Sequence, residues 1–238
     1  MTVKEVIRYY STISEKYDRL RLGSEKSKFI SILQLDWFVK NLKNNSILLE
    51  IGCGTGRVTQ LLVKKSKFLI AVDASPAMIK INRCRLKNSL VCYVVCDATY
   101  LPFRGNTFDN IVGARVFWHI PNFSKALRES SRALKIGGVL LFDFPSSQGP
   151  FSLYTRLCHV KNDVLTLFAR KSDIEKAFKP IYNISFFYNT TIFVFFTPAK
   201  LFKCEMICRL LQLLEKLNYK FFNNYVFSYF LIRVVKKL

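Results

Sequence analysis

A glycine-rich turn preceded by an acidic residue is the feature of this sequence best suited to binding a ligand. Residues 48–56 read LLEIGCGTG, so Glu50 lies in an apolar run and Gly52, Gly54 and Gly56 follow it. Such a turn lets backbone N–H groups approach a ligand at the start of a helix. The spacing fits neither the dinucleotide fingerprint nor the phosphate loop, because Arg57 follows the last glycine. The carboxylate instead favours a ligand with a cationic end.

Two further carboxylates follow apolar runs later in the chain. Asp73 comes after Ala-Val, about 20 positions beyond the turn, where an acidic residue accepts hydrogen bonds from ribose hydroxyls. Asp97 follows Cys96 and has the chemistry to accept from an exocyclic amine. If the three runs are parallel strands, Glu50, Asp73 and Asp97 converge on one crevice at their carboxyl ends.

The elements that must position these residues alternate regularly. Short apolar runs predict strands, and the stretches between them have helical character, as does the N-terminal segment 3–43. Ser24, and Ser75 followed by Pro76, are expected to cap helices. The expected strands are 46–51, 68–72, 90–95, 110–114 and 139–144, and the expected helices between them are 55–65, 75–88 and 124–134. A further helix is expected near 199–217. This alternation predicts an α/β fold with a doubly wound parallel sheet and helices on both faces.

Composition limits the function classes. The 238 residues are 50% hydrophobic and carry a formal charge of +21, spread along the chain without a basic tail. This charge is compatible with nucleic acid or an anionic membrane surface, and equally with a solvated lysine-rich surface. The seven cysteines include no CxxC pair, so reduced core thiols are expected and no metal site. The N-terminus lacks a signal-peptide core, and run 181–196 is too polar and short to span a bilayer, so we expect a cytoplasmic protein.

Four segments together carry a family resemblance: LLEIGCGTG, AVDASPAMI, CDATYLPFRGNTFDNIV and SRALKIGGVLLF. They resemble the class I S-adenosylmethionine-dependent methyltransferases, in particular the broad group that includes the ubiquinone/menaquinone-biosynthesis methyltransferases. The resemblance implies a Rossmann-like, mostly parallel seven-stranded sheet whose antiparallel C-terminal strand comes from 181–196 and 224–235. It also implies one methyltransferase domain over 1–238, with a helical cap (1–45), a cofactor-binding core (46–144) and an acceptor-side segment (145–238).

The resemblance also implies roles for individual residues toward S-adenosylmethionine. Asp73 would bind the ribose hydroxyls, and Asp97 the adenine amine with the Ala98 N–H beside it. Ala74 and Met78 would lie near the adenosine. The methionine moiety would be surrounded by Glu50, Gly52, Cys53, Gly54 and Gly56, with Ala114 and Arg115 along its amino-acid end.

The acceptor side is less determined. His119 follows the fourth strand and is the candidate general base, with a packed structural histidine as the alternative. Tyr9, Tyr10 and Tyr17 are candidates to close over the cofactor, and packing is again the alternative. Residues 151–238 are rich in aromatics, which fits an apolar acceptor pocket, a dimer or membrane face, or a buried core.

Three functions follow from these observations. The first is methyl transfer to a small-molecule acceptor, apolar or lipid/quinone-like. The second is RNA methylation, suggested by the charge, although the segment after the fourth strand lacks the Asn/Asp-Pro-Pro-aromatic pattern of base methyltransferases. The third is a non-catalytic cofactor-binding module. Nucleic acid, peripheral membrane contact and a homodimer are the alternative partners.

Overall fold

A seven-stranded sheet organises the protein. In the computed structural model, the described residues are 1–87, 90–147, 152, 164–178, 182–189, 201, 204–211, 213 and 229–237. The strands run in the order β3-β2-β1-β4-β5-β7-β6, and β7 is antiparallel to both of its neighbours. The strand bounds are β1 Ser46–Ile51, β2 Ser66–Asp73, β3 Val91–Val95, β4 Phe108–Gly113, β5 Leu134–Pro145, β6 Tyr182–Asn189 and β7 Tyr229–Lys236. The expected fold class, including the antiparallel C-terminal strand, is confirmed.

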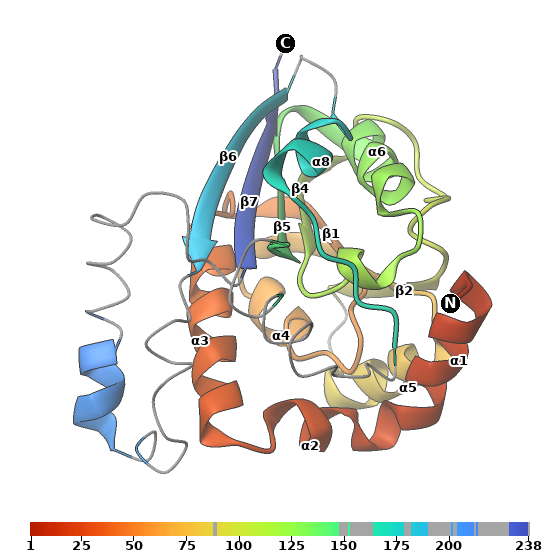
Figure 1. The fold of residues 1–238 in the computed structure, drawn as a ribbon. Helices are drawn as coiled ribbons and strands as arrows, with labels where there is room; N and C mark the ends of the chain where they lie inside the picture. Colours follow the sequence, from red (N-terminus) through yellow and green to blue (C-terminus); the bar gives the residue numbers. More distant parts are fainter. Residues whose placement is uncertain are drawn as a thin grey trace.

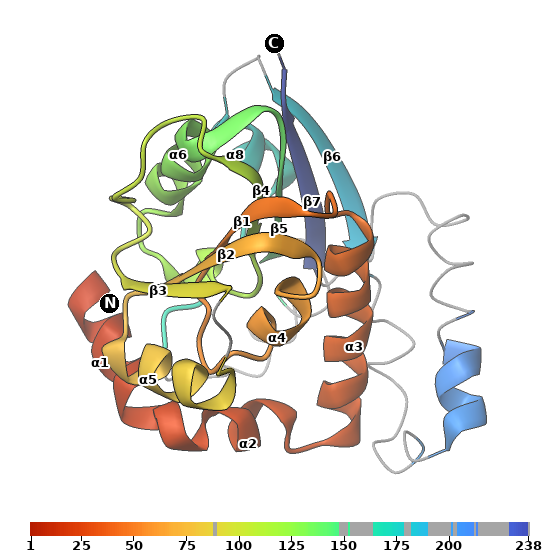
Figure 2. The ribbon, with the colours of Figure 1, turned by 180° about the vertical axis from the view of Figure 1, so that it is seen from behind.

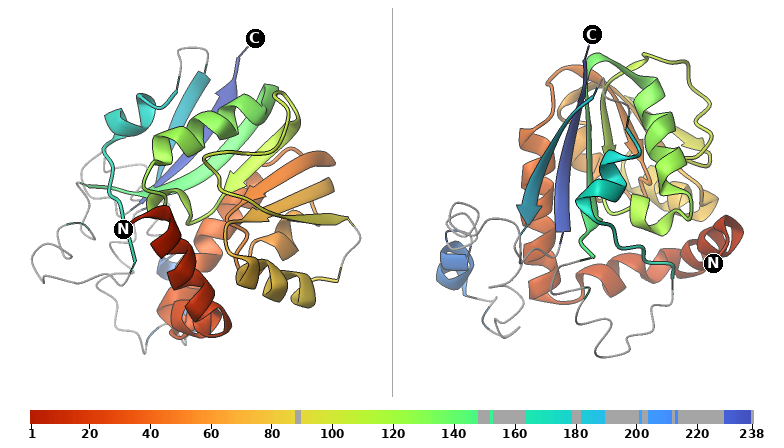
Figure 3. Two further views of the ribbon diagram at one scale, coloured as in Figure 1. Left: turned by 90° about the vertical axis from the view of Figure 1, so that its right-hand side faces the viewer. Right: turned by 45° about the horizontal axis from the view of Figure 1, so that its top comes forward.

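Helices cover both faces of this sheet (Figures 1 and 3), with α3 and α4 on one face and α6 and α8 on the other. Central strands of a parallel sheet are apolar on both sides. Accordingly, Leu48 packs with the α3 and α4 side of the core, whereas Leu49 packs with the α6 side. The helix bounds are α1 Val3–Ile13, η1 Ser14–Lys16, α2 Tyr17–Leu22, α3 Glu25–Lys40, α4 Thr59–Leu62, α5 Pro76–Arg85, η2 Phe117–His119, α6 Phe123–Ala133 and α8 Lys171–Glu175.

Caps divide the N-terminal segment into separate helices. Thr2 and Glu5 form a capping box at the start of α1, and the Ser24 hydroxyl accepts from the Ser27 N–H at the start of α3. Ser75 caps α5 with Pro76 at its first position, as expected. Helices α1 and α5 lie side by side beyond the edge of the sheet near β3 (Figure 2), and the hydroxyls of Ser11 and Ser75 are 2.8 Å apart.

Two elements differ from the sequence expectation. The helix expected over 55–65 is reduced to α4, because Gly56 has φ +92° and the helical backbone starts only beyond the turn. Strand β5 begins at Leu134 rather than at 139, because it continues directly from α6 through Gly137 at φ +73°. Both differences arise from the backbone conformation at a glycine, and hydrophobic periodicity carries no information on that conformation.

The C-terminal expectations are tested in part. Residues 205–211 are helical, within the helix expected near 199–217, whose remainder falls largely outside the described residues. Residues 190–196 and 224–228 of the two expected C-terminal strands also lie outside the described residues. The division into cap, core and acceptor-side segment stays a prediction. No helix among the described residues combines the length and apolarity needed to cross a bilayer.

Candidate functional site

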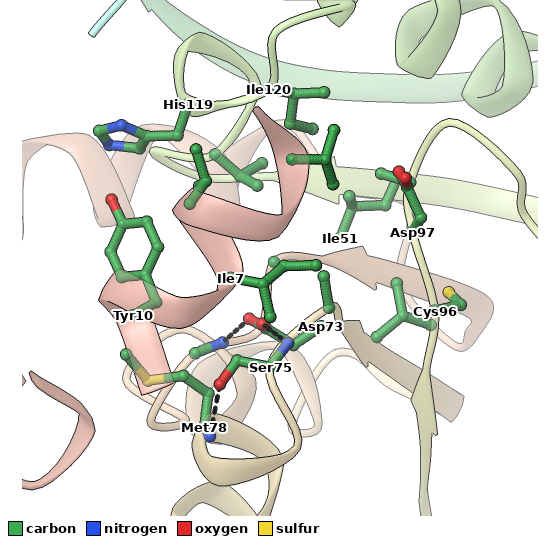
Figure 4. Close-up of a pocket in the computed structure, with 18 of the residues that line it drawn as sticks. Ile7, Tyr10, Ile51, Asp73, Ser75, Met78, Cys96, Asp97, His119 and Ile120 are labelled. Carbon is green, nitrogen blue, oxygen red and sulfur yellow. Dashed lines mark hydrogen bonds between the residues drawn. The ribbon is translucent and has the colours of Figure 1, made fainter. Parts of the chain in front are cut away.

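A cavity that is partly open to solvent, with about 810 Å³ of empty space including that open part, lies where β1, β2, β3 and β4 end. Helix α1 forms one wall through Val3, Val6, Ile7 and Tyr10, so segments far apart in sequence enclose one space. In Figure 4, Tyr10 and His119 lie on one side of the cavity, and Asp97 and Cys96 lie on the other. The predicted site residues that line it are Gly52, Gly54, Asp73, Ala74, Met78, Asp97, Ala98, Arg115 and His119.

The glycine turn between β1 and α4 fits closely on one side and is open on the other. Gly52 and Gly54 have φ +69° and +52°, a region that side chains disfavour. A Cβ at Gly52 would lie 2.4 Å from Val116 Cγ2, whereas a Cβ at Gly54 would meet no atom within 4 Å. Gly52 therefore lets the turn pack against the segment after β4, and Gly54 leaves room in the cavity for a ligand.

Asp73, at the end of β2, ties the turn to the neighbouring strand. Its Oδ2 accepts from the Gly54 N–H at 2.9 Å and its Oδ1 accepts from the Ser75 N–H at 2.9 Å (Figure 4). Burial raises the pKa of Asp73, and these N–H groups oppose that rise. Each carboxylate oxygen has a second lone pair, so the side chain can still accept hydrogen bonds from a ligand.

Asp97, just beyond β3, lies across the cavity from α1. Its Oδ1 accepts from the Thr99 N–H at 2.8 Å, which fixes the loop after the strand. Ala98 lines the cavity beside it. The structure thus brings Asp73 and Asp97 together around one space, as expected from the ends of parallel strands.

Glu50 is buried beneath the turn and does not line the cavity; neither do Cys53, Gly56 and Ala114. Burial raises the pKa of Glu50 to about 8, and the charge of Asp73 adds to the rise while a hydrogen bond with Thr59 opposes it. Its Oε2 has no hydrogen-bond partner among the described residues. A buried carboxyl with an unsatisfied oxygen is suited to a nearby cationic group.

This raised pKa predicts a pH effect on stability. The folded state holds the Glu50 proton up to about pH 8, whereas an unfolded chain releases it near 4.5, so stability falls as pH rises between these values. We expect Glu50→Gln to remove this fall. In urea unfolding of the ligand-free protein, the free energy of unfolding of the variant relative to that of the wild type should increase by on the order of several kcal/mol between pH 5 and pH 9. Parallel stability curves for the two proteins would contradict this assignment.

Both ring nitrogens of His119 are engaged within the protein. Its Nε2 accepts from Trp118 Nε1–H at 2.7 Å, so Nδ1 carries the proton and donates to the Leu165 carbonyl at 2.6 Å. Burial lowers the pKa of His119 to about 3, and the charges of Arg21 and Arg115 lower it further. The imidazole is thus neutral with no nitrogen free to take a proton, and this geometry favours the packed structural histidine over the general base, the two alternatives considered for His119. The hydrogen bond from His119 to the Leu165 carbonyl instead holds the segment around Leu165 in place.

We expect the His119 ring resonances to stay unshifted between pH 5 and pH 8 in NMR spectra of the folded protein. We also expect His119→Ala to destabilise the fold by about 2–4 kcal/mol, because the Trp118 N–H and the Leu165 carbonyl lose their partner. A ring that titrates near 6.5, or a variant of unchanged stability, would instead favour a free catalytic imidazole.

Two features of the cavity and its surroundings were missed by sequence reasoning. Asp143 lies within β5 with no exposed surface; its Oδ1 accepts from the Arg115 N–H at 2.6 Å and its Oδ2 has no hydrogen-bond partner among the described residues. The signal was a lone acid in the apolar run LLFDF. The apolar residues that α1 contributes to the wall were also missed. Of the tyrosines considered as candidates to close over the cofactor, Tyr10 and Tyr17 line the cavity, whereas Tyr9 packs on Tyr10 with ring centroids 5.4 Å apart.

The unsatisfied atoms fit one kind of ligand end. Arg115 Nε is buried without a hydrogen-bond partner in the described part of the chain, as are Glu50 Oε2 and Asp143 Oδ2. A donor from Arg115 suits a carboxylate, and the two acceptor oxygens suit an ammonium. An amino-acid end attached to a nucleoside therefore matches the groups present, with Asp73 and Asp97 available to the nucleoside.

Comparison with known proteins agrees with this geometry. Residues 49–142 match the family described as a methyltransferase domain. A demethylmenaquinone methyltransferase of Thermotoga maritima is 33% identical over 59% of this chain and 61% of its own length. A tRNA (carboxymethyluridine(34)-5-O)-methyltransferase of Arabidopsis thaliana is 31% identical over 59% of this chain and 34% of its own. The chain thus spans less than two thirds of the length of these curated relatives.

Solved structures share the fold. One is a methyltransferase from a complex with the Haloferax volcanii Trm112 methyltransferase activator. It gives a TM-score of 0.68 at 14% identity, and the alignment covers 96% of this chain and 98% of the other chain. A Haemonchus contortus phosphoethanolamine N-methyltransferase in complex with S-adenosyl-L-methionine gives 0.60 at 20% identity, covering 87% of this chain and 52% of its own.

Proposed function

Because the chain belongs to the class I S-adenosylmethionine-dependent methyltransferases, we propose that it transfers a methyl group from S-adenosylmethionine to a small-molecule acceptor. The observation that carries the proposal is the cavity where the strand ends of Asp73 and Asp97 face the open side of the Gly54 turn. This arrangement offers carboxylate acceptors to a nucleoside and backbone close to its amino-acid end.

The proposed roles follow from these positions. Asp73 holds the ribose hydroxyls and Asp97 the adenine amine, with the Ala98 N–H at a ring nitrogen. Arg115 and the glycine turn hold the methionine end. The bound sulfonium supplies an already activated methyl group, so the protein has to orient the acceptor and exclude water. Helix α1 is placed to do the latter, because its apolar residues form one wall of the cavity.

An acceptor with an apolar portion is supported by the cavity wall and by one relative. Apart from α1, the wall includes Ile51, Val116 and Ile120. The Thermotoga relative is named for a demethylmenaquinone acceptor. Such walls favour a flat or aliphatic acceptor over a freely hydrated one.

RNA is the second candidate acceptor, and two observations favour it. The formal charge of +21 suits a polyanion, and the Arabidopsis relative is named for a tRNA nucleoside. A protein partner is a related possibility to test, since the Haloferax structure is a complex with an activator.

One labelling experiment separates these acceptors. The protein is incubated with methyl-labelled S-adenosylmethionine and with separate lipid, small-molecule and RNA fractions. We expect saturable label in the lipid or small-molecule fraction. Saturable label in RNA alone would replace the small-molecule proposal. Tight S-adenosylmethionine binding without label in any fraction would favour a non-catalytic module.

A further inference from the structure

A buried acidic residue of β5 lies beside the segment that follows β4. The last paired residues of the two strands are Gly113 and Phe142, and β5 continues to Pro145 while the chain after β4 leaves the sheet. Asp143 is therefore the first residue of β5 next to the departing chain, and it has no exposed surface. A carboxylate is costly to bury in an apolar strand, so the contact that Asp143 makes there has to offset that cost.

Asp143 is hydrogen-bonded to the backbone of Arg115. Its Oδ1 accepts from the Arg115 N–H at 2.6 Å. Its Oδ2 and the Arg115 Nε both lack a hydrogen-bond partner among the described residues, so these two atoms do not pair with each other. Burial raises the pKa of Asp143 to about 6, so the side chain is a carboxylate at neutral pH and the bond to the Arg115 N–H is charge-assisted.

The backbone of Arg115 has a conformation that needs such support. Its φ is +58°, in the left-handed region that an L-residue adopts only at an energetic cost. Two residues later, Phe117 packs edge-on against Phe142 of β5, with ring centroids 5.2 Å apart. The hydrogen bond to Asp143 is thus a second point at which β5 holds this segment, and it acts at the strained residue itself.

Arg115 lines the cavity, whereas Asp143 is not among the residues that do. The Arg115 Nε is buried, and an N–H group left unpaired in this way costs free energy unless a ligand supplies the acceptor. A carboxylate is the acceptor that suits a guanidinium best, and the methyl donor carries one at its amino-acid end. We therefore expect an effect of Asp143 on this ligand to pass through Arg115.

Resting on the methyl transfer proposed above, we propose that Asp143 is a positioning residue, which holds Arg115 in the conformation that presents its guanidinium to the carboxylate of the methyl donor. Strand β5 is a rigid support for this role, because it pairs with β4 on one side and with β7 on the other. Asp143 then controls how tightly the amino-acid end of the donor binds and leaves the nucleoside end unaffected. Neither the sequence motifs nor the roles implied by the family resemblance assign a role to Asp143.

The test compares two ligands that differ at the amino-acid end. S-adenosylhomocysteine carries this end, whereas 5′-methylthioadenosine has the same nucleoside and a thioether but neither the carboxylate nor the ammonium. Both are titrated calorimetrically into the full chain at pH 7.5. In Asp143→Ala, we expect S-adenosylhomocysteine to bind about 10- to 100-fold more weakly, the usual effect of losing one charge-assisted hydrogen bond, and 5′-methylthioadenosine to keep its affinity within about twofold.

Two further variants separate positioning from a general loss of stability. Asp143→Asn has the same shape and keeps an oxygen that can accept from the Arg115 N–H, so we expect a smaller loss of S-adenosylhomocysteine affinity, about three- to fivefold. Asp109→Ala is the matched control, because Asp109 also accepts from a backbone N–H, that of Ile47 at 3.0 Å, but lies near the start of β4 and away from the cavity. It should leave both affinities unchanged.

A double-mutant cycle tests the route through Arg115. Arg115→Gln removes the guanidinium and should itself weaken S-adenosylhomocysteine binding. If Asp143 acts through that guanidinium, adding Asp143→Ala to Arg115→Gln should cost less than about twofold more. Fully additive losses would mean that Asp143 contacts the ligand directly or acts through another residue, and they would overturn the positioning role.

The outcomes separate this inference from the proposed function. Unchanged S-adenosylhomocysteine affinity in folded Asp143→Ala, or equal losses for the two ligands, overturns the positioning role and leaves methyl transfer intact. If Asp143→Ala does not fold, the same comparison of the two ligands in Asp143→Asn decides. If S-adenosylhomocysteine does not bind to the folded wild type, the methyl-transfer proposal fails and this inference fails with it.

Discussion

Asp73→Ala is expected to weaken S-adenosylmethionine binding by about 100-fold or more. The Asp73 carboxylate accepts from the N–H groups of Gly54 and Ser75, each at 2.9 Å, so the substitution removes ligand contacts and also releases the glycine turn. Hydrogen bonds to a charged group contribute about 1.5–3 kcal/mol each, and two or more are lost together. Calorimetric titration with S-adenosylmethionine measures the effect directly.

Two variants make the Asp73 prediction specific. Asp73→Asn keeps one carbonyl oxygen, and we expect an intermediate loss of about tenfold. Asp36→Ala removes the same charge from an exposed ion pair with Lys40 and should leave binding unchanged. If folded Asp73→Ala keeps the wild-type affinity, Asp73 does not contact the ligand. The proposed orientation of the nucleoside then loses its main support.

Gly52→Ala is expected to destabilise the fold by about 2–4 kcal/mol. The new Cβ would lie 2.4 Å from Val116 Cγ2, and the residue would have to hold φ +69°. Overpacking costs about 1–3 kcal/mol and a left-handed backbone about 1–2 kcal/mol for an L-residue. Urea unfolding measures the loss, and S-adenosylhomocysteine affinity should fall as Val116 is displaced from the cavity wall.

Gly54→Ala is the matched control for Gly52→Ala. It has a similar φ of +52°, but its Cβ would meet no atom within 4 Å. We expect it to cost about 1–2 kcal/mol from the backbone alone while still weakening cofactor binding, because its methyl group enters the cavity. Equal destabilisation by the two variants would show that the contact with Val116 does not contribute to the loss of stability in Gly52→Ala.

The strand pattern and the acidic strand ends could be read from the sequence because buried parallel strands are apolar on both faces. β1 agrees with its expected bounds, and Asp73 and Asp97 meet across one cavity because parallel strands end at the same edge. Local capping was also readable: Ser24 and Ser75 cap α3 and α5 as expected. In these cases the determining interactions are local or periodic.

The rest depends on contacts between residues distant in sequence. The engagement of both His119 nitrogens requires Leu165, which lies 46 positions away, and no spacing rule predicts it. The place of Arg115 beside Asp143 depends on the pairing of β4 with β5. Glu50 has the expected residue type at the expected position, yet its burial and its hydrogen bond with Thr59 of α4 are tertiary features that residue types alone do not encode.

Tyr10 of α1 packs on the His119 ring, with centroids 5.5 Å apart, and that ring in turn fixes Leu165. One continuous chain of contacts therefore runs from the wall of the donor cavity to the segment that leads into α8. A ligand that restrains α1 from inside the cavity is therefore expected to restrain the segment around Leu165 through these contacts. By linkage, a change that loosens this segment is expected to weaken ligand binding in the cavity.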